Sequence, residues 1–535
     1  MVAGGHPATA RAGAELLRVG GNAADAAVGM VAAAACAEAC LTGLGGGGFA
    51  LVREPGGHAE ILDFFVTAPG LGRTPEDLAS RAHIEPYVVP FRSTTQTFYV
   101  GPASCAVPGI PLGLTTLHAR HGRLSLERVL APAVRLARAG ALVVPQQDYL
   151  HDILEGILTR EEGMRRIFTP DGYLVRSGEV LRSPDLAVAL ERLGAEGAEP
   201  FTHGVYAQRM AEYLDRHGGL ITLEDLAAYE VIIREPVVAS YRGHEILTNP
   251  LPSSGGTLIA FSLGLLDRAD LSALDEVGRA VAVISALEAT DEVRVSDFDA
   301  QRGMPGFATA FLSPANLDRH AADPRGAGGP VRGGAAAKER SLLGGEPGNT
   351  THVCAIDADG MSVSLTTSCG AGSGVIVDGT GIYLNNMMGE EDLNPGGFFT
   401  LPPGERLTSM MAPTIAWGRK ATGEERLVAL GSAGSARLRS AIVQVLVNVL
   451  DGQMEAAAAV DVPRAHVDAG TVHLEAGTPA DVETTLRLSG RTVQAWSARD
   501  LYFGGVQMVS REGREAASRF DGAGDPRRGG AALLV

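Results

Sequence analysis

The chain has 535 residues, of which 45% are hydrophobic and 20% charged, as expected for a soluble globular protein with a sizeable core. Its 62 acidic residues outnumber its 45 basic residues, and the resulting net charge of −17 argues against binding to a nucleic acid backbone. No basic segment followed by an apolar one opens the chain, and the most apolar run, residues 23–41, carries Asp25 and Glu38. We therefore expect no signal peptide, no membrane span and a cytoplasmic location.

The first half of the chain alternates helical and strand-like patterns. Apolar spacing predicts a helix over residues 8–20, and Asn22 is a suitable cap for a second helix that runs to about Cys40. A glycine run leads into a strand over residues 49–52, and residues 110–230 are mostly helical in pattern. Residues 231–260 return to strand-like sequence around a turn at Pro252-Ser253-Ser254-Gly255-Gly256.

A change of composition separates the two halves of the chain. Residues 321–349 are rich in glycine, contain proline and lack hydrophobic periodicity, which predicts a flexible loop. Two strand-like runs, 350–356 and 361–367, then flank an Asp-Ala-Asp-Gly turn and predict a β-hairpin. A flexible segment therefore leads directly into a strand that begins with Thr350.

The glycine run at residues 43–48 formally contains the GxGxxG spacing of a dinucleotide site. That motif needs a strand before the glycines and a helix after them, whereas here the predicted order is reversed. We therefore interpret the glycines as positions where backbones approach closely, and we disfavour a cofactor-dependent oxidoreductase. The thirteen histidines show no HxxxH or HExxH spacing and the five cysteines no CxxC pair, so neither a metal nor a cofactor is predicted.

A threonine at the junction of a loop and a strand can carry chemistry of its own. Its hydroxyl can attack the preceding carbonyl, here that of Asn349, in an N-to-O acyl shift whose hydrolysis leaves a new N-terminal threonine. The free α-amine of such a residue has a pKa of about 7.7–8.0 and can act as the base for its own hydroxyl, directly or through one water.

Motifs along the whole chain resemble those of the γ-glutamyltranspeptidase family, which belongs to the N-terminal-nucleophile hydrolases. The matching segments are His6-Pro7, 16–27 (LLRVGGNAADAA), 43–49 (GLGGGGF), 107–109 (VPG), 252–256 (PSSGG), 350–352 (TTH), 381–386 (GIYLNN), 409–414 (SMMAPT) and 431–437 (GSAGSAR). The resemblance implies an α+β fold, a four-layer αββα sandwich in which two stacked antiparallel sheets lie between helical layers.

The resemblance also implies a precursor that cuts itself between Asn349 and Thr350. The products would be a large part of 349 residues, ending in the flexible loop, and a small part of 535 − 349 = 186 residues, which together form one αββα unit and a heterodimer. Family roles then fall on Thr350 as nucleophile, on Thr366 and Ser368 as hydroxyls that orient it, and on the backbone N–H groups of Gly434 and Ser435 as the oxyanion hole.

The glutamate-binding positions depart from the family pattern. Phe65 stands where the family has the arginine that clamps the substrate carboxylate, and Met387 replaces the residue that binds the α-amine. Ser409 keeps one serine of the SSM motif but Met410 replaces the other, and the acidic position appears only as Glu390. Between residues 366 and 372 the chain is also about two residues short, so the family's asparagine there has no clear counterpart.

The predicted function is that of a self-cleaving amidohydrolase or acyltransferase that acts on a small-molecule amide and has altered, more hydrophobic or differently charged acyl specificity. One alternative is a true γ-glutamyltransferase or glutathione hydrolase in which Arg92 or Arg406 replaces the missing clamp. Another is an inactive scaffold protein on the same fold. Whether water or an amine accepts the acyl group, and whether the heterodimer assembles further, stays open.

Overall fold

The structure is a computed structural model, and it describes residues 1–90, 95–321, 350–419, 423–513 and 518–535. Asn349, Arg92 and nearly all of the loop predicted over residues 321–349 lie outside the described residues.

Two antiparallel sheets form the centre of the described chain. In spatial order, the seven-stranded sheet contains β22 (Ala531–Leu533), β1 (Val2–Gly4), β11 (Thr350–Ile356), β12 (Ser362–Ser368), β2 (Gly47–Arg53), β3 (Ala59–Phe64) and β8 (Ile232–Arg234). The six-stranded sheet contains β21 (Arg519–Ala523), β20 (Gly505–Glu512), β16 (Glu425–Ala433), β15 (Thr414–Arg419), β10 (His244–Thr248) and β9 (Val237–Tyr241). In the first sheet, β1 lies between β22 and β11, and β12 pairs with β2; in the second sheet, β15 pairs with β10. Strands from before and after residue 350 therefore build both sheets together.

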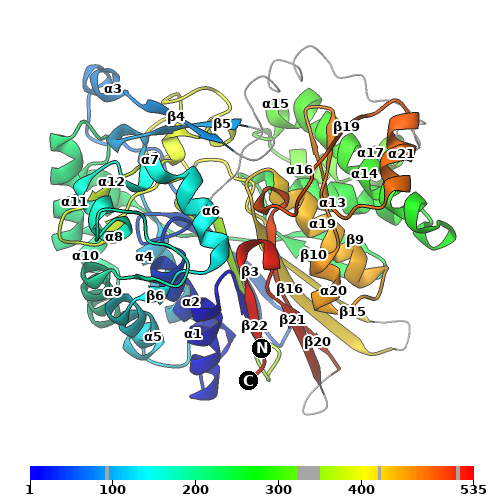
Figure 1. Cartoon of the computed structure of the whole chain (residues 1–535), viewed down its shortest axis with the longest axis horizontal. Helices are drawn as coiled ribbons and strands as arrows, with labels where there is room; N and C mark the ends of the chain where they lie inside the picture. Colours follow the sequence, from blue (N-terminus) through cyan, green and yellow to red (C-terminus); the bar gives the residue numbers. More distant parts are fainter. Residues whose placement is uncertain (91–94, 322–349, 420–422, 514–517) are drawn as a thin grey trace.

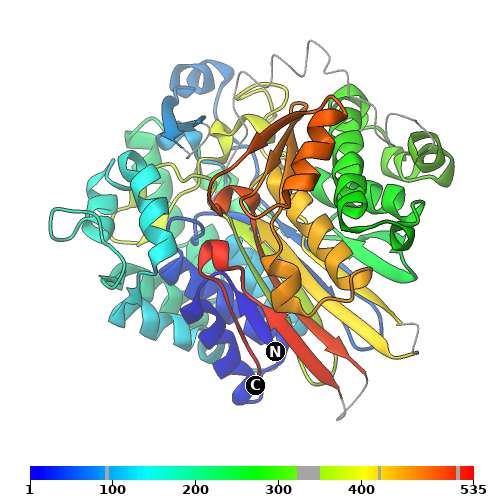
Figure 2. The same cartoon turned by 45° about the vertical axis from the view of Figure 1, so that its right-hand side comes forward.

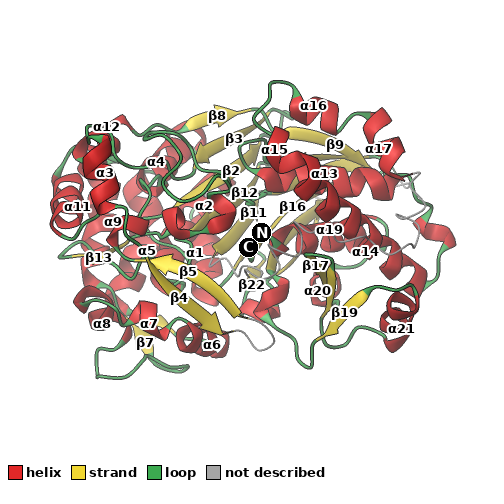
Figure 3. Ribbon diagram, turned by 90° about the horizontal axis from the view of Figure 1, so that it is seen from above, coloured by secondary structure: helices red, strands yellow, loops and turns green. Residues whose placement is uncertain are grey.

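Helices cover the outer face of each sheet (Figure 1). On the seven-stranded side lie α1 (Pro7–Arg18), α2 (Ala23–Ala37), α4 (Ile110–His121), α5 (Leu126–Ala139) and α9 (Pro184–Glu196). On the six-stranded side lie α13 (Ser254–Asp267), α14 (Glu276–Val293) and α19 (Arg437–Leu450). Seen from above, the strands run between these two groups of helices (Figure 3).

Three apolar clusters fill the spaces between the four layers. One packs α2 and its neighbours against the seven-stranded sheet, and another packs α13, α14 and α19 against the six-stranded sheet. The third lies between the sheets and includes Phe49, Phe65, Ile356, Ile415 and Val509. The four-layer αββα sandwich expected from the resemblance is thus confirmed.

The chain's two ends meet at one edge of the seven-stranded sheet. Strand β1 pairs on one side with β22, near the C-terminus, and on the other with β11. Figure 2 shows the two termini next to each other at this edge. The strand that begins with Thr350 is therefore held between an N-terminal strand and β12, inside the sheet and not at its margin.

Several elements follow directly from local sequence chemistry. Asn22 and Asp25 form a reciprocal capping box at the start of α2, and all fifteen residues of that helix are buried, as its alanine-rich composition favours. Strands β11 and β12 form the predicted hairpin around the Asp-Ala-Asp-Gly turn. Both predictions are confirmed.

The segment around Pro252 is different from its prediction. The strands end at Thr248, and helix α13 begins at Ser254, so residues 254–260 are helical where strand-like structure was expected. An added Cβ at Gly255 or Gly256 would overlap backbone carbonyl groups of Met410 and Asn249. The glycine pair therefore permits close packing of a helix and does not form a turn between strands.

Close backbone approach also explains the glycine run before β2. A Cβ at Gly45 would lie 2.9 Å from the Cα atom of Leu384, and one at Gly46 would lie 2.9 Å from the carbonyl carbon of Ser368. Real Cβ atoms essentially never come this close to other atoms. The interpretation of these glycines as packing positions is confirmed, and Gly46 packs directly against Ser368 at the end of β12.

Candidate active site

Thr350 is the first residue of β11 and pairs with Ser368, the last residue of β12. Both side chains are almost fully buried. The Thr350 hydroxyl donates a hydrogen bond of 3.3 Å to the Ser368 Oγ atom, which also accepts one of 2.8 Å from the Gly370 N–H group. Two fixed partners therefore set the position of the Ser368 hydroxyl, which in turn can orient the hydroxyl of Thr350.

Thr366 lies two pairs further along the same two strands, opposite His352. Its hydroxyl is 2.9 Å from the His352 Nδ1 atom, and burial lowers the pKa of this histidine to about 3, so the ring is neutral. Thr366 thus stabilises the interior of the hairpin. In the part of the chain that the structure describes, the hydroxyl bonded to Thr350 is that of Ser368.

The turn between β16 and α19 contains Gly434 and Ser435, and Ser435 lines the same region. Gly434 has φ = 118°, a conformation that favours glycine, and Ser435 has φ = 49°, which costs about 1–3 kcal/mol for a residue with a side chain. Helix α19 begins two residues later, at Arg437. Backbone N–H groups in a turn that leads into a helix, together with the helix dipole, favour negative charge, which suits a developing oxyanion.

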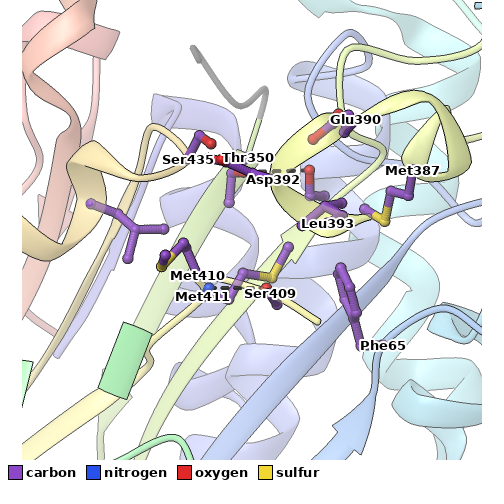
Figure 4. A pocket seen from close by; sticks show the side chains of 12 residues that line it. Phe65, Thr350, Met387, Glu390, Asp392, Leu393, Ser409, Met410, Met411 and Ser435 are labelled. Atoms are coloured by element: carbon purple, nitrogen blue, oxygen red, sulfur yellow. Dashed lines mark hydrogen bonds between the residues drawn. The ribbon is translucent and has the colours of Figure 1, made fainter. Parts of the chain in front are cut away.

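A small pocket, partly open to solvent, joins these groups (Figure 4). Its lining consists of Phe65, Thr350, Ser368, Met387, Glu390, Asp392, Leu393, Ser409, Met410, Met411, Ser435 and Leu438. All five residues predicted to bind substrate are among them, as are three of the five predicted catalytic residues. Thr366 and Gly434 lie behind the lining.

Four lining residues were not singled out from the sequence. Asp392 and Leu393 follow Glu390 in the short helical segment η5 (Glu391–Leu393), and Met411 follows Met410. Leu438 lies in the first turn of α19. Met411 lies within the matched motif 409–414, and Leu438 directly follows the motif 431–437. Proximity to these motifs is the signal that could have found them.

Phe65 closes the pocket where the family pattern would place a cation. Its ring is fully buried and stacks on Phe49 with the ring centroids 5.3 Å apart. Its carbonyl oxygen accepts a hydrogen bond of 2.6 Å from the Tyr229 hydroxyl and a second from Arg406. The backbone at this position is held firmly, and its side chain offers only an apolar surface.

Arg406 is committed elsewhere and does not replace the missing clamp. Its guanidinium stacks over the Tyr229 ring at 4.9 Å, donates to the Tyr229 hydroxyl at 2.7 Å, and pairs with Asp63 at 3.4 Å. It lines a separate pocket together with Thr67 and Asp225. The other candidate for that role, Arg92, lies outside the described residues.

The Glu390 carboxyl group lies beside Gly370, in the segment that follows β12. Gly370 has φ = 65°, and a Cβ there would collide with the carboxyl group of Glu390 and the amide of Asn386. The Glu390 Oε1 atom accepts a hydrogen bond of 3.1 Å from the Ala371 N–H group. Burial, together with the nearby charge of Asp392, raises the pKa of Glu390 to about 7.

A second buried carboxyl group supports the strand that begins with Thr350. The Glu38 side chain accepts hydrogen bonds of 2.5 Å from the Thr351 hydroxyl and 2.7 Å from the Thr9 hydroxyl, and burial raises its pKa. This contact fixes the residue next to the candidate nucleophile onto the N-terminal helices. No motif near Glu38 predicts this contact.

The fold and this geometry can be compared with known proteins. The family model described as Gamma-glutamyltranspeptidase matches residues 9–535. The chain belongs to this family. It is 34% identical over 500 residues to the acylase ACY 1 proenzyme of Pseudomonas sp. (strain V22), covering 92% of the chain and 87% of that protein. It is 30% identical over 558 residues to the glutathione hydrolase proenzyme of Escherichia coli (strain K12), and this match covers 98% of the chain and 90% of that protein.

Among solved structures, the cephalosporin acylase from Bacillus halodurans matches with a TM-score of 0.80 and 26% identity, over 100% of the chain and 96% of that structure. The family and these relatives identify the chain as an amidohydrolase or acyltransferase of the N-terminal-nucleophile type. They give no support to an oxidoreductase or to an inactive scaffold.

Two further observations concern the described residues only. They contain no group of three or more His, Cys, Asp or Glu side chains arranged to hold a metal ion. Within the same residues, every helix is too short or too polar to cross a membrane.

Proposed function

We propose that Thr350 is the nucleophile of this enzyme and becomes N-terminal when the chain cuts itself between Asn349 and Thr350. The observation that supports this most directly is the buried Thr350 hydroxyl at the start of β11, held against Ser368 in a pocket that Ser435 also lines. The names of two relatives include the word proenzyme, which agrees with a precursor of this kind. The mature protein would be a heterodimer of the two products.

The reaction then follows from the groups around the pocket. The free α-amine takes the proton of the Thr350 hydroxyl, whose oxygen attacks the amide carbonyl, and the N–H groups of Gly434 and Ser435 stabilise the oxyanion. Collapse breaks the C–N bond, the departing amine takes the proton, and an ester remains on Thr350. Water or a second amine attacks this ester and restores the hydroxyl. Losing one oxyanion donor costs about 3–4 kcal/mol in comparable sites, so both are needed.

The donor is an amide other than an ordinary γ-glutamyl compound. A substrate α-carboxylate placed against Phe65 and Met410 would be buried without a partner, at a cost of about 3–5 kcal/mol. The names of the acylase relatives agree with a different acyl group. A true γ-glutamyltransferase with a substitute clamp is the less favoured alternative, because Arg406 already binds Tyr229 and Asp63.

Gel electrophoresis of the purified protein tests the nucleophile. We expect wild type to show two bands of about two-thirds and one-third of the 55.4 kDa chain, and Thr350→Ala to show one band and no turnover. Thr350→Ser, which keeps a hydroxyl, should still be cut. A single uncut band that turns over an acyl donor at the wild-type rate would refute the proposal.

A further inference from the structure

The turn that would form the oxyanion hole has a strained backbone. Ser435 has φ = 49°, in the left-handed region that residues with a side chain rarely adopt. Such a conformation persists only where the surrounding structure holds it. Two backbone hydrogen bonds close the turn, from the Arg437 N–H group to the Gly434 carbonyl at 3.0 Å and from the Leu438 N–H group to the Ser435 carbonyl at 3.2 Å. The contacts on either side of the turn therefore decide where its N–H groups lie.

On its N-terminal side, the turn is held by the start of β20. Ala433 pairs with Gly505, whose N–H group donates a hydrogen bond of 3.1 Å to the Ser432 hydroxyl. A Cβ added at Gly434 would lie 3.1 Å from the Gly504 Cα atom, which is tighter than nine in ten real contacts. The six-stranded sheet itself thus fixes this side of the turn.

On its C-terminal side, the turn leads into a buried arginine that stacks on an aromatic ring. Arg437 is 1% exposed, and its guanidinium carbon lies 4.7 Å from the centroid of the Tyr502 ring. Tyr502 belongs to the short helical segment η6 (Leu501–Phe503), and its ring stacks on Trp496 with the centroids 4.5 Å apart. The attraction between a guanidinium and a ring face is stronger when both are removed from water, as they are here.

Tyr502 is itself held in place by contacts that do not involve the turn. Its N–H group donates a hydrogen bond of 2.9 Å to the Asp500 carboxylate, and the Asp500 N–H group donates one of 3.3 Å to the Glu475 carboxylate. Burial raises the pKa of the Tyr502 hydroxyl, although the charge of Arg437 acts in the opposite direction, so the ring stays neutral. It is a fixed, neutral surface for Arg437, on a segment outside every matched family motif.

We infer that Tyr502 is a positioning residue for the oxyanion hole, and that it acts through its stack with Arg437 on the N–H groups of Gly434 and Ser435. The inference rests on the proposed function, in which those two groups stabilise the oxyanion. Arg437 is the first residue of α19 and lies two positions after Ser435, so a shift of its side chain is passed directly to the turn. Because the oxyanion forms only during the reaction, loss of the stack weakens binding of the transition state and leaves binding of the substrate unchanged.

Three substitutions test the role of the stack. Tyr502→Phe keeps the ring face and should keep the wild-type kcat. Tyr502→Leu removes the ring, and Arg437→Lys keeps the charge but loses the planar group that stacks. Both should lower kcat by about 10- to 100-fold and leave KM within about twofold, since complete loss of one oxyanion donor costs about 100- to 1,000-fold. Arg437→Lys carries the test should Tyr502→Leu not fold.

The assay uses an acyl p-nitroanilide and rates expressed per cut chain. The donor is whichever of the butyryl, glutaryl and γ-glutamyl compounds wild type turns over fastest. Each turnover releases 4-nitroaniline, whose absorbance is measured, and the two bands on a gel give the amount of cut chain.

Inhibition by propylboronic acid separates a displaced oxyanion hole from a partly inactive preparation. The Thr350 oxygen adds to boron and its proton passes to the α-amine, which leaves a tetrahedral anion with one hydroxyl at the oxyanion position. In Tyr502→Leu, Ki should rise by the same factor by which kcat/KM falls. A defect that only lowers the fraction of active enzyme would reduce kcat and leave Ki at its wild-type value.

Phe520→Leu is a matched control at the far end of the same strand. The Phe520 ring centroid lies 5.9 Å from the guanidinium carbon of Arg511, which is six positions along β20 from Gly505. This substitution also removes a ring from an arginine, and it should leave kcat, KM and Ki at their wild-type values.

The outcomes for the inference and for the proposed function are distinct. Wild-type kcat in Tyr502→Leu, a lower kcat with an unchanged Ki, or an equal loss in Phe520→Leu overturns the inference, while the assignment of Thr350 stands. A wild-type chain that stays uncut, or one that is cut and turns over none of the three compounds, contradicts the proposed function instead.

Discussion

Gly46→Ala is the sharpest test of how the glycine run supports the active site. The added Cβ would lie 2.9 Å from the Ser368 carbonyl carbon and 2.9 Å from the Cys369 Sγ atom, and closer still to the Ser368 carbonyl oxygen. Ordinary contacts begin at 3.4 Å, so Ser368 must move by more than 3.4 − 2.9 = 0.5 Å. Gly46 itself cannot retreat easily, because its carbonyl accepts hydrogen bonds from Gly109 at 2.9 Å and Ile110 at 3.2 Å.

We expect Gly46→Ala to slow mainly the chemical step of the reaction. Ser368 holds the Thr350 hydroxyl at 3.3 Å, and a misplacement approaching 1 Å at a reacting group can reduce the rate by about 100-fold. We expect kcat to fall by about 10- to 100-fold for the best acyl donor, and the free energy of unfolding to fall by about 1–3 kcal/mol through overpacking. Steady-state kinetics and thermal unfolding measure the two effects separately.

Gly56→Ala is a matched control for this substitution. A Cβ at Gly56 would have no atom within 4 Å, and the residue is exposed. It should leave both kcat and the melting temperature unchanged. If Gly46→Ala keeps wild-type kcat and stability, the glycine run does not position Ser368, and the reasoning from close backbone approach is wrong.

Two further predictions concern recognition in the pocket. Phe65→Arg should raise kcat/KM for γ-glutamyl-p-nitroanilide by about tenfold by supplying a carboxylate partner, whereas Phe65→Leu should not; equal values for the two variants would count against it. Loss of the buried ring that stacks on Phe49 should cost about 2–4 kcal/mol of stability in both. Because burial raises the pKa of Glu390 to about 7, its carboxylate forms as the pH rises through 7, and KM for a donor that occupies this pocket should change between pH 6 and 8. The stability that neutral Glu390 contributes has the opposite sign, being complete below pH 4.5 and lost as the pH rises through about 7; a flat KM profile, or one that Glu390→Gln leaves in place, would refute the assignment.

Local patterns and family motifs predicted most of the architecture. The reciprocal bonds of Asn22 and Asp25, the hairpin that begins with Thr350, and the tight packing of Gly45 and Gly46 each depend on residues within a short segment or on one steric requirement. The helix start at Ser254 was missed because a Pro-Ser-Ser-Gly-Gly sequence has the composition of a turn. Only the approach of the Met410 backbone shows why glycines occur within that helix.

The site was predicted less completely, because its contacts join segments far apart in the chain. Nothing in the sequence near Glu38 indicates that its carboxyl group meets the Thr351 hydroxyl, which is 313 positions away. The shortened segment after β12 left a family asparagine without a counterpart, and only the structure shows the Glu390 carboxyl group in the space beside Gly370. For Arg406 the sequence suggested a role that the structure does not support. It was a candidate to bind the substrate carboxylate, but its guanidinium is held by Tyr229.

The structure also explains how recognition can change while the chemistry is kept. Thr350, Ser368 and the turn at Gly434 lie at the ends of central strands, where ladder hydrogen bonds and packed glycines constrain each backbone. Met387 and Glu390 lie instead on short connections beyond those strands, which tolerate substitution more easily. Phe65 follows the end of β3, and only its side chain faces the pocket, while its backbone is held by Tyr229. We expect that a phenyl ring in place of a cation at such a position alters which acyl group binds and leaves the strand ends that would position the nucleophile and the oxyanion donors in place.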